Sequence, residues 1–430
     1  MSEEMNIVPE LRFPEFVEFD IWEKKKLADV ADLKNGYTFK SSSYVETGNY
    51  GIVTIGNVQQ GRLATDSIKK IDKVPNDVQR HQILQIGDIL ISMTGNVGRT
   101  CIVNEENLLL NQRVGKIIPE NILSNYLYQY TQRNQFIENL QKSAVGGAQG
   151  NISTSDIREI KLPVPKNPQE QQKIASCLSS LDELLAAHND KLDALKEHKK
   201  GLMQNLFPQE GETVPKVRFP EFEGDGEWDS EPLQEICKLV RGPFGGALKK
   251  EIFVEKGYAV YEQSHAIYSD FSNFRYRIND EKYHELKRFS VRASDLIMSC
   301  SGTMGKFSMI PSDFEEGVIN QALLKLTVKT GYDVSFIKTS LETETNQRQL
   351  LSQSAGGAIK NVVSVSQIRI LELSVPGLKE QQKIASCLSA VDELITDQQE
   401  KIEQLQQHKK GLMQGLFPNS STNSAVTIES

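Results

Sequence analysis

The sequence predicts an α+β protein with two globular domains separated by two long antiparallel helices, which form a coiled-coil spacer, and with an internal pseudo-twofold repeat. Three observations predict this architecture. The stretch 170–208 recurs at 380–418 without a gap and with most positions identical. Both copies carry a helical heptad pattern, and shorter motifs before each copy also recur. The period is too long for a solenoid unit and therefore indicates a duplicated domain that ends in a long helix.

The two long helices are expected at 167–208 and 377–418, because apolar residues recur at alternating steps of four and three, the a/d pattern of a coiled coil. Asn167-Pro168 supplies an N-cap and a first-turn proline, whereas Gly377 is a weaker start. A Phe-Pro pair closes both stretches. At about 1.5 Å per residue, each helix would be roughly 60 Å long. The a/d positions of each helix form a seam, and polar residues interrupt both seams at the same two places. The first seam runs through Ile174, Leu178, Leu181, Leu185, His188, Leu192, Leu195, Lys199, Leu202 and Leu206. The second runs through Ile384, Leu388, Val391, Ile395, Gln398, Ile402, Leu405, Lys409, Leu412 and Leu416.

The globular domains are expected over residues 1–166 (domain 1) and 209–376 (domain 2), with a disordered C-terminal tail at 419–430. Each domain opens with Arg-Phe-Pro-Glu-Phe, and Trp22 or Trp228 follows shortly after. Short β-rich runs separated by Gly/Asn turns, and one helix before each spacer helix, favour an α+β arrangement. The expected strands are Tyr50–Ile55, Asp88–Met93 and Val114–Ile118, and the expected helices lie near Ser124–Gln141 and Ser335–Ser352.

Composition excludes several classes of protein. The chain has 430 residues and a formal net charge of −8, which argues against bulk electrostatic binding of nucleic acid but not against local basic faces. It has no signal peptide and no long apolar run, so we expect no membrane insertion. Its five cysteines show no CxxC or metal spacing, which indicates buried reduced thiols in a cytoplasmic protein.

Connectivity predicts that the two long helices are antiparallel. The first helix ends where domain 2 begins, so a second helix lying along it must run back toward domain 1. A parallel pair would also place Lys199 against Lys409, and close like charges are unfavourable. The antiparallel arrangement places each lysine near the apolar start of the opposite helix, with its ammonium group free to reach solvent. The alternative is that each helix pairs with a second chain in a dimer.

No catalytic, metal or cofactor constellation is found. The glycine-containing segments 95–100 and 302–306 do not meet the P-loop spacing and are expected to be tight turns after a strand. There is no GxSxG and no HExxH motif. Among the six histidines, His198 and His408 are repeat-equivalent and suit a helix C-terminus or a contact surface better than a ligand role. We therefore expect a protein that is not an enzyme.

Two variable domains alternating with two near-identical long helices, each ending in Leu-Phe-Pro, resemble the specificity (S) subunit of a type I restriction-modification enzyme. The resemblance covers the whole chain apart from its tails. It implies that each domain reads one half of a split, asymmetric double-stranded DNA sequence, and that the helices act as spacer and as docking site for two methyltransferase (M) subunits. It also implies that S-adenosylmethionine, ATP and magnesium act in the methyltransferase and restriction/translocase (R) subunits.

Comparison of the two halves of the chain suggests which residues serve each role. A sequence that is the same in both halves should serve a contact that the protein makes twice. The identical helix ends would form two equivalent docking surfaces, with the alternative that they merely pack on the domains. The candidate docking residues are Glu170, Gln171, Lys173, His198, Lys199 and Lys200, and Glu380, Gln381, Lys383, His408, Lys409 and Lys410. The helix middles drift in sequence and would set the separation of the half-sites.

Residues that read different DNA half-sites should differ between the domains. Arg and Gln can pair with G and A through two hydrogen bonds, whereas Lys mainly meets phosphate. The candidates are Asn57, Gln59, Gln60, Arg62, Lys69, Lys70 and Arg80 in domain 1, and Gln263, Ser264, His265, Tyr268, Arg275, Tyr276, Arg277 and Arg288 in domain 2. A solvated surface is the alternative for each.

Shared segments are expected to be scaffold or phosphate contacts. These are Asn111-Gln112, Asn320-Gln321 and the Gly-Gly loops at 146–147 and 356–357. Loops at 34–40, 241–250, 149–151 and 359–361 could also approach the duplex. The alternative function is a coiled-coil adaptor whose two domains bind proteins or glycans.

Overall fold

The computed structural model describes residues 7–19, 21–144, 151–244, 246–352 and 365–418. The Gly-Gly loops, the loop at 359–361, most of the loop at 149–151 and the C-terminal tail lie outside these residues. The chain divides into two compact units, residues 1–189 with 400–430 (unit 1) and residues 190–399 (unit 2). The division falls inside both long helices, so each unit holds one globular domain and about half of each helix. The domain boundaries at the helix ends stay a prediction.

The long helices are α5 (Pro168–Leu206) and α12 (Leu378–Leu416), as predicted. The side chain of Asn167 accepts a hydrogen bond from the backbone N–H of Gln169 at 2.9 Å, which is the expected N-terminal cap. In the second copy, the carbonyl of Gly377 accepts from the N–H of Glu380 at 2.9 Å, and no cap side chain is available there.

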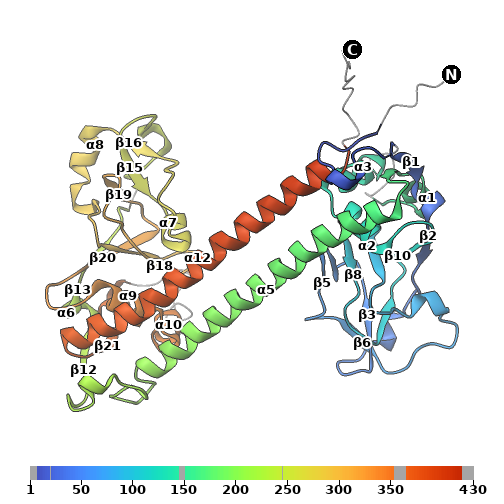
Figure 1. Ribbon diagram of the computed structural model, residues 1–430. Coiled ribbons are helices and arrows are strands. Elements are labelled where there is room, and N and C mark those ends of the chain that lie inside the picture. Colours follow the sequence, from blue (N-terminus) through green and yellow to red (C-terminus); the bar gives the residue numbers. More distant parts are fainter. Residues whose placement is uncertain (1–6, 20, 145–150, 245, 353–364, 419–430) are drawn as a thin grey trace. The chain divides into compact units, whose positions relative to one another are not determined.

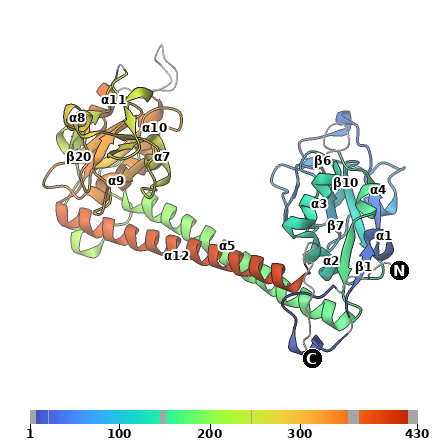
Figure 2. The ribbon, with the colours of Figure 1, turned by 90° about the horizontal axis from the view of Figure 1, so that it is seen from above.

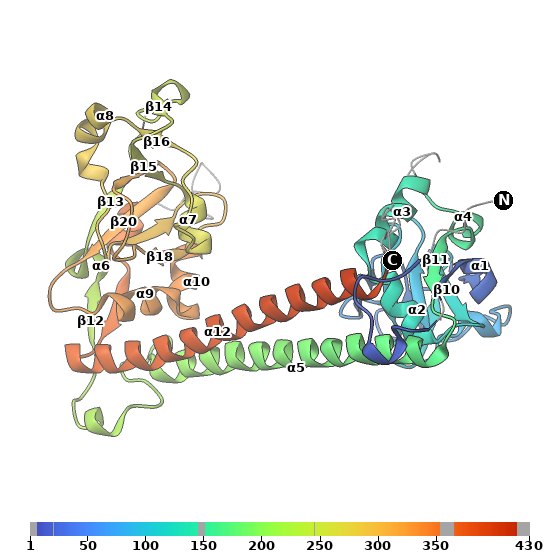
Figure 3. The same cartoon turned by 45° about the horizontal axis from the view of Figure 1, so that its top comes forward.

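Packing within each unit shows that the helices are antiparallel. In unit 1, Ile174 and Leu178 near the start of α5 share a core with Leu416 and Phe417 at the end of α12. Unit 2 repeats this arrangement with the start of α12 against the end of α5. Figures 1 and 3 show the two ribbons side by side in both units. The predicted antiparallel pair is therefore confirmed.

The seam lysines are ion-paired and not free, which corrects the expectation from sequence. Lys199 lies 2.6 Å from Asp392 in unit 2, and Lys409 pairs with Asp182 in unit 1. Both lysine side chains are largely covered along their length, while their ammonium groups end on a carboxylate of the opposite helix. The two pairs are repeat-equivalent, because Asp-Glu-Leu follows the identical helix start in both copies.

Each domain contains a four-stranded antiparallel sheet and a second sheet with one parallel pair. In domain 1 the strand orders are β2-β10-β7-β8 and β6-β3-β9, with small ladders β1-β11 and β4-β5. Strands β3 and β9 are the parallel pair. The strands are β1 (Glu23–Lys26), β2 (Ala31–Asn35), β3 (Tyr50–Val53), β4 (Val58–Gln59), β5 (Arg62–Leu63), β6 (Lys69–Ile71), β7 (Ile89–Ser92), β8 (Thr100–Ile102), β9 (Leu108–Leu110), β10 (Val114–Pro119) and β11 (Lys161–Val164).

Domain 2 repeats the first sheet and the parallel pairing. Its strand orders are β13-β20-β17-β18, β14-β16-β15-β19 and β12-β21, and β15 and β19 are parallel. The strands are β12 (Asp229–Pro232), β13 (Cys237–Arg241), β14 (Phe253–Val254), β15 (Tyr258–Tyr261), β16 (Arg277–Ile278), β17 (Leu296–Ser299), β18 (Phe307–Met309), β19 (Gly317–Ile319), β20 (Leu323–Val328) and β21 (Glu372–Val375).

Short helices cover the sheets. In unit 2, α7 contacts β17 and β18 and α9 contacts β18, and Figure 2 shows the domain that holds these helices. Two short helices replace each single helix expected before the spacer. In domain 2 the break lies at Thr343, whose extended backbone (ψ 149°) ends α9. In domain 1 it lies at Gln132 and Arg133, where the buried Arg133 side chain donates to the carbonyl of Pro418 at 3.4 Å. The helices are α1 (Leu27–Val30), α2 (Ser124–Thr131), α3 (Asn134–Ala144), α4 (Thr154–Arg158), α6 (Leu233–Ile236), α7 (Gln263–Tyr268), α8 (Asp280–Glu285), α9 (Val334–Glu342), α10 (Glu344–Ser352) and α11 (Val365–Arg369).

Strands β7 and β17 are apolar at almost every position because both of their faces are covered. All four residues of each strand are buried. One face contributes to the core with the long helices and the other to a core under the second sheet, as Ile91 and Leu90 show in domain 1. Among the described residues, no helix is both long enough and apolar enough to cross a membrane.

Candidate nucleic-acid interface and docking surfaces

Domain 2 contains a polar hollow of about 510 Å³. Its walls come from the start of α7, the segment 273–275 before β16, and the turn 320–322 between β19 and β20. The lining residues are Glu262, Gln263, Ser264, His265, Asn273, Arg275, Asn320 and Ala322. Four of the predicted DNA-reading residues of this domain, Gln263, Ser264, His265 and Arg275, are thus brought together at one site.

Gln263 and His265 hold the hollow in shape. The amide nitrogen of Gln263 donates to the carbonyls of Ser301 and Thr303, the latter at 3.2 Å. The imidazole Nδ1 of His265 accepts from the N–H of Glu262 at 2.8 Å, and Nε2 donates to the carbonyl of Asn273 at 3.2 Å. His265 is also buried and stacks on Phe274, with ring centroids 4.7 Å apart. The polar groups of Gln263 and His265 are thus bound inside the domain, whereas Ser264, Asn273 and Arg275 of the lining are exposed.

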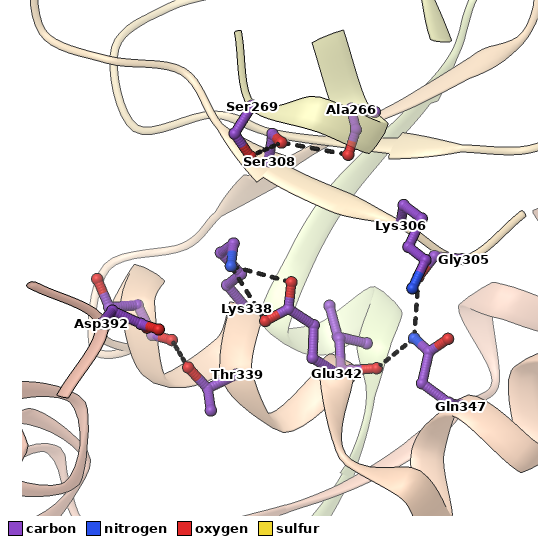
Figure 4. Close-up of polar contacts among 12 residues, drawn as sticks. Ala266, Ser269, Gly305, Lys306, Ser308, Lys338, Thr339, Glu342, Gln347 and Asp392 are labelled. Atoms are coloured by element: carbon purple, nitrogen blue, oxygen red, sulfur yellow. Dashed lines mark hydrogen bonds and ion pairs between the residues drawn. The ribbon is translucent and has the colours of Figure 1, made fainter. Parts of the chain in front are cut away.

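The hairpin that Gln263 binds is fixed from two further sides (Figure 4). The amide of Gln347 on α10 donates to the carbonyl of Gly305 at 3.0 Å. The hydroxyl of Ser308 on β18 donates to the carbonyl of Ala266 on α7 at 3.2 Å. Gly302 and Gly305 have φ values of 59° and 73°, so this segment is the tight turn predicted from sequence.

The other candidates of domain 2 differ in availability. Tyr268 is 76% exposed. Arg277 forms an ion pair with Glu315 at 2.5 Å, and this hydrogen bond lowers the pKa of Glu315 and raises that of Arg277. Tyr276 stacks on Phe253, with centroids 4.3 Å apart. Arg288 is exposed in the short turn after α8.

Domain 1 has a hollow of about 450 Å³ at a different place in its fold. Its lining residues are Gln79, Arg80, His81, Ile83, Gln85 and Lys116. Only Arg80 was predicted from sequence. The run Gln79-Arg80-His81-Gln82 was the available signal, but it begins at the very end of the divergent segment that was considered. Lys116 pairs with Asp88 at 2.5 Å, and His81 contacts the carbonyl of Asn35 at 3.1 Å.

Two candidates of domain 1 have structural roles. Asn57 is buried, and its side chain accepts from the N–H of Thr54 at 2.9 Å and donates to the carbonyl of Ala64 at 2.8 Å. Gln60 accepts from the N–H of Thr100 at 3.1 Å and donates to the side chain of Gln132 at 3.0 Å.

The remaining candidates of domain 1 lie away from its hollow. Gln59 is exposed on β4, and Arg62 pairs with Asp66 at 3.3 Å on the surface. Lys69 lies over the ring of Tyr44 at 4.9 Å, and Lys70 is half-buried on β6.

The backbones of the shared Asn-Gln pairs have a structural role. A Cβ at Gly36 would lie 2.2 Å from the carbonyl oxygen of Asn111, and one at Gly242 would lie 1.8 Å from that of Asn320. Both pairs therefore mark a close approach of two backbones that only glycine permits.

The Arg-Phe-Pro-Glu-Phe segments contact the starts of the long helices. Arg12 binds Glu170 through Nε at 2.7 Å and Nη2 at 2.9 Å, and Trp22 donates to the same carboxylate at 3.2 Å. In unit 2, Arg218 binds Glu380 at 2.8 Å and 2.7 Å. Glu170 and Glu380 are only 1% and 2% exposed.

Gln171 and Gln381 are also hydrogen-bonded within their own units. Gln171 accepts from the N–H of Leu123 at 3.0 Å, and Gln381 accepts from that of Asp333 at 2.9 Å. Each also donates to a carbonyl just before its helix. Burial therefore removes Glu170, Gln171, Glu380 and Gln381 from the docking surface expected from sequence, because their side chains bind their own unit.

Other candidate docking residues reach the surface. Lys173 and Lys383 pair with Glu15 and Glu221, both at 3.2 Å, and are half-exposed. His198, Lys200, His408 and Lys410 are exposed.

Sequence reasoning missed two exposed leucines on the long helices. Leu184 and Leu394 are 42% and 53% exposed and are repeat-equivalent. The signal was present, because Asp-Glu-Leu is identical in both copies while the flanking residues differ. Among the described residues, no group of three or more His, Cys, Asp or Glu side chains could hold a metal ion.

Comparisons with known proteins agree on one family. A family model described as type I restriction modification DNA specificity domain matches residues 20–197 and again 225–407. The MjaX specificity subunit of a type I restriction enzyme from Methanocaldococcus jannaschii is 23% identical over 91% of this chain and 92% of its own length. The EcoBI specificity subunit from Escherichia coli is 19% identical over 85% and 78%.

Two solved structures share the fold. The S subunit from M. genitalium has a TM-score of 0.56 at 15% identity, covering 96% of this chain and all of that one. A chain from a type I restriction-modification system, described for complex assembly and conformational transition, has a TM-score of 0.53 at 14% identity, covering 93% and 98%.

Proposed function

The chain belongs to the family of type I restriction-modification DNA specificity subunits, and we propose that each of its two domains reads one half of a bipartite, asymmetric double-stranded DNA target. A specificity subunit is the non-catalytic member of its complex. Family membership removes the alternative of an adaptor for proteins or glycans. The observation that carries the proposal is the pair of hollows, because they lie in equivalent domains and are lined by different polar residues.

The division between scaffold and reading residues supports two different half-sites. The shared features, Gly36 with Asn111 and Gly242 with Asn320, hold backbones together. The divergent side chains Arg80 and Arg275 line the hollows and are exposed. An arginine can donate two hydrogen bonds to guanine in the major groove, which suits both positions to base reading. With a net charge of −8, the chain needs such local basic groups to approach DNA.

The long helices provide two equivalent surfaces for two copies of one methyltransferase subunit. In unit 1 the surface holds Lys173 and Leu184 from α5, and Lys410 from α12. In unit 2 it holds Lys383, Leu394 and Lys200. Restriction subunits join through that complex. S-adenosylmethionine, ATP and magnesium act in the partner subunits, and the complex acts in the cytoplasm.

The test is to reconstitute the chain with its methyltransferase subunits, methylate random-sequence DNA and map the modified adenines by single-molecule sequencing. We expect two short defined sequences separated by a gap of several base pairs without sequence preference, since dimeric readers place half-sites about one helical turn apart. A continuous target, or methylation without sequence preference, would contradict the proposal.

A further inference from the structure

Domain 2 exposes an aromatic ring at the edge of its polar hollow. Phe244 follows β13 and is 69% exposed. Two residues earlier, the backbone of Gly242 lies against Asn320, which lines the hollow. The guanidinium carbon of Arg241 lies 5.9 Å from the centroid of the Phe244 ring. The ring therefore lies next to a site whose exposed lining residues, Ser264, Asn273 and Arg275, are polar.

Arg241 carries hydrogen-bond donors without acceptors. Its Nε and Nη1 atoms are buried and have no hydrogen-bond partner in the described part of the chain. A buried charged donor left unpaired is costly, and native proteins keep few of them. An external acceptor that reaches this guanidinium would therefore stabilise the arrangement. A phosphate oxygen of DNA is such an acceptor, and a hydrogen bond between a charged arginine and a phosphate is stronger than a hydrogen bond between neutral groups.

Domain 1 has Asn35 and Thr38 at the positions equivalent to Arg241 and Phe244. The glycines Gly36 and Gly242 are equivalent, which places Thr38 at the position of Phe244. The Thr38 hydroxyl donates to the side chain of Gln112 at 2.6 Å, so this position is occupied inside domain 1. The exposed ring is thus one of the features that differ between the domains. Such a difference is expected for a residue that acts on one half-site only.

We propose that Phe244 stacks on a base at a partly opened step of the DNA half-site read by domain 2, and that Arg241 pairs with a phosphate beside that step. Apolar side chains that enter between bases kink the duplex at flexible steps, such as pyrimidine–purine steps. The Arg241 guanidinium carbon lies 5.9 Å from the centroid of the Phe244 ring, so the two groups would meet the DNA at the same step. This inference rests on the proposed DNA-reading function and adds a readout of DNA deformability to domain 2 alone.

The experiment uses the full complex with its methyltransferase subunits and measures binding to the intact target and to targets with one scrambled half-site. Phe244→Ala should reduce discrimination against a scrambled domain 2 half-site by about tenfold, because base–aromatic stacking is lost. Discrimination at the domain 1 half-site should stay unchanged. Phe244→Trp should retain the wild-type preference. The matched control is Ile370→Ala, which removes an exposed apolar side chain (62% exposed) from the turn before β21.

A spectroscopic arm separates stacking from a general loss of contact. With 2-aminopurine placed at each position of the domain 2 half-site in turn, the wild-type complex should change the fluorescence at one position, and Phe244→Ala should abolish that change. Arg241→Gln should lower the slope of log affinity against log salt concentration by about one, as expected for one lost phosphate contact.

The outcomes are distinguishable. If the wild-type complex is selective at both half-sites and Phe244→Ala is equally selective with the same fluorescence, the inference is wrong and the proposed function stands. If the wild-type complex shows no sequence preference, the proposed function fails and the inference fails with it. An unchanged salt slope in Arg241→Gln would contradict the phosphate contact.

Discussion

The guanidinium of Arg12 donates two hydrogen bonds to the carboxylate of Glu170, with donor–acceptor distances of 2.7 Å and 2.9 Å, although the residues are 158 positions apart in the chain. Arg218 and Glu380 form the same pair in unit 2. Two motifs shared by both halves, Arg-Phe-Pro-Glu-Phe and Glu-Gln-Gln-Lys, are therefore the two sides of one contact. This contact ties the opening of each domain to the start of the long helix in the same unit.

Removing Arg12 should destabilise unit 1. In Arg12→Ala the 1%-exposed Glu170 carboxylate loses its cation, and breaking a buried pair on one side costs about 3 kcal/mol of unfolding free energy. Hydrogen exchange around residues 123–130 and 170–178 should report the loss, with unit 2 unaffected. Arg62→Ala is the control, because its pair with Asp66 is exposed and worth under about 1 kcal/mol. Equal effects of the two substitutions would contradict this role.

The two tryptophans provide a matched pair of substitutions. The indole N–H of Trp22 donates to Glu170, whereas that of Trp228 is buried without a partner in the described residues. Both changes to phenylalanine lose similar packing, but only Trp22→Phe removes a hydrogen bond to a charged group, worth about 1.5–3 kcal/mol. Trp22→Phe should therefore be the more destabilising of the two in chemical denaturation. The reverse order would show that packing, and not this bond, decides.

Alkaline pH should destabilise domain 1 through Cys101. Burial raises the pKa of this thiol from 9.0 to about 12. Above pH 9 the unfolded thiol loses its proton while the folded one keeps it, so the stability present below pH 9 is lost as pH rises. The loss is at most about 1.4 kcal/mol per pH unit. Between pH 9 and 10, Cys101→Ala should show a flatter decline of unfolding free energy than wild type. Identical slopes would exclude the thiol as the cause.

Leu184 and Leu394 should each control the binding of one methyltransferase subunit. A buried aspartate at either position would be an unpaired charge, so Leu184→Asp and Leu394→Asp should each weaken one docking site by tenfold or more. Mass measurement of the assembled complex should show one bound methyltransferase subunit with either single change and none with both. Ile86→Asp, at an exposed apolar residue of domain 1, should leave both sites intact. Loss of both subunits from a single change would refute two independent surfaces.

The long helices and their direction could be predicted from sequence because heptad spacing, caps and connectivity are local or topological signals. The Arg12–Glu170 pair could not be predicted, because no local pattern links residues so far apart. The internal repeat showed that both motifs matter but not that they touch. The assumption that identical helix ends serve a partner led to Glu170 and Gln171, which are buried in their own unit.

The placement of the candidate reading residues was only partly predictable, because residue type does not give the direction of a side chain. Gln263, Ser264, His265 and Arg275 lie within one short divergent segment, and the structure places all four in the lining of one hollow. The structure turns Gln263 and His265 inward, where backbone carbonyls occupy their donors. Phe244 lies in the loop at 241–250 that was expected to approach the duplex, but it was not named among the polar candidates, because an exposed apolar residue carries no sequence signal of its exposure.

The most direct test of the central claim, that the domains read DNA while the helices set spacing, is to insert one heptad into both helices, near Asn189 and Gln399. Seven residues add about 10 Å to each helix and keep its apolar seam in register. Mapped methylation sites of the reconstituted complex should then show both wild-type half-sites with a gap longer by about three base pairs, at about 3.4 Å each. Unchanged spacing, or half-sites of new sequence, would contradict the account.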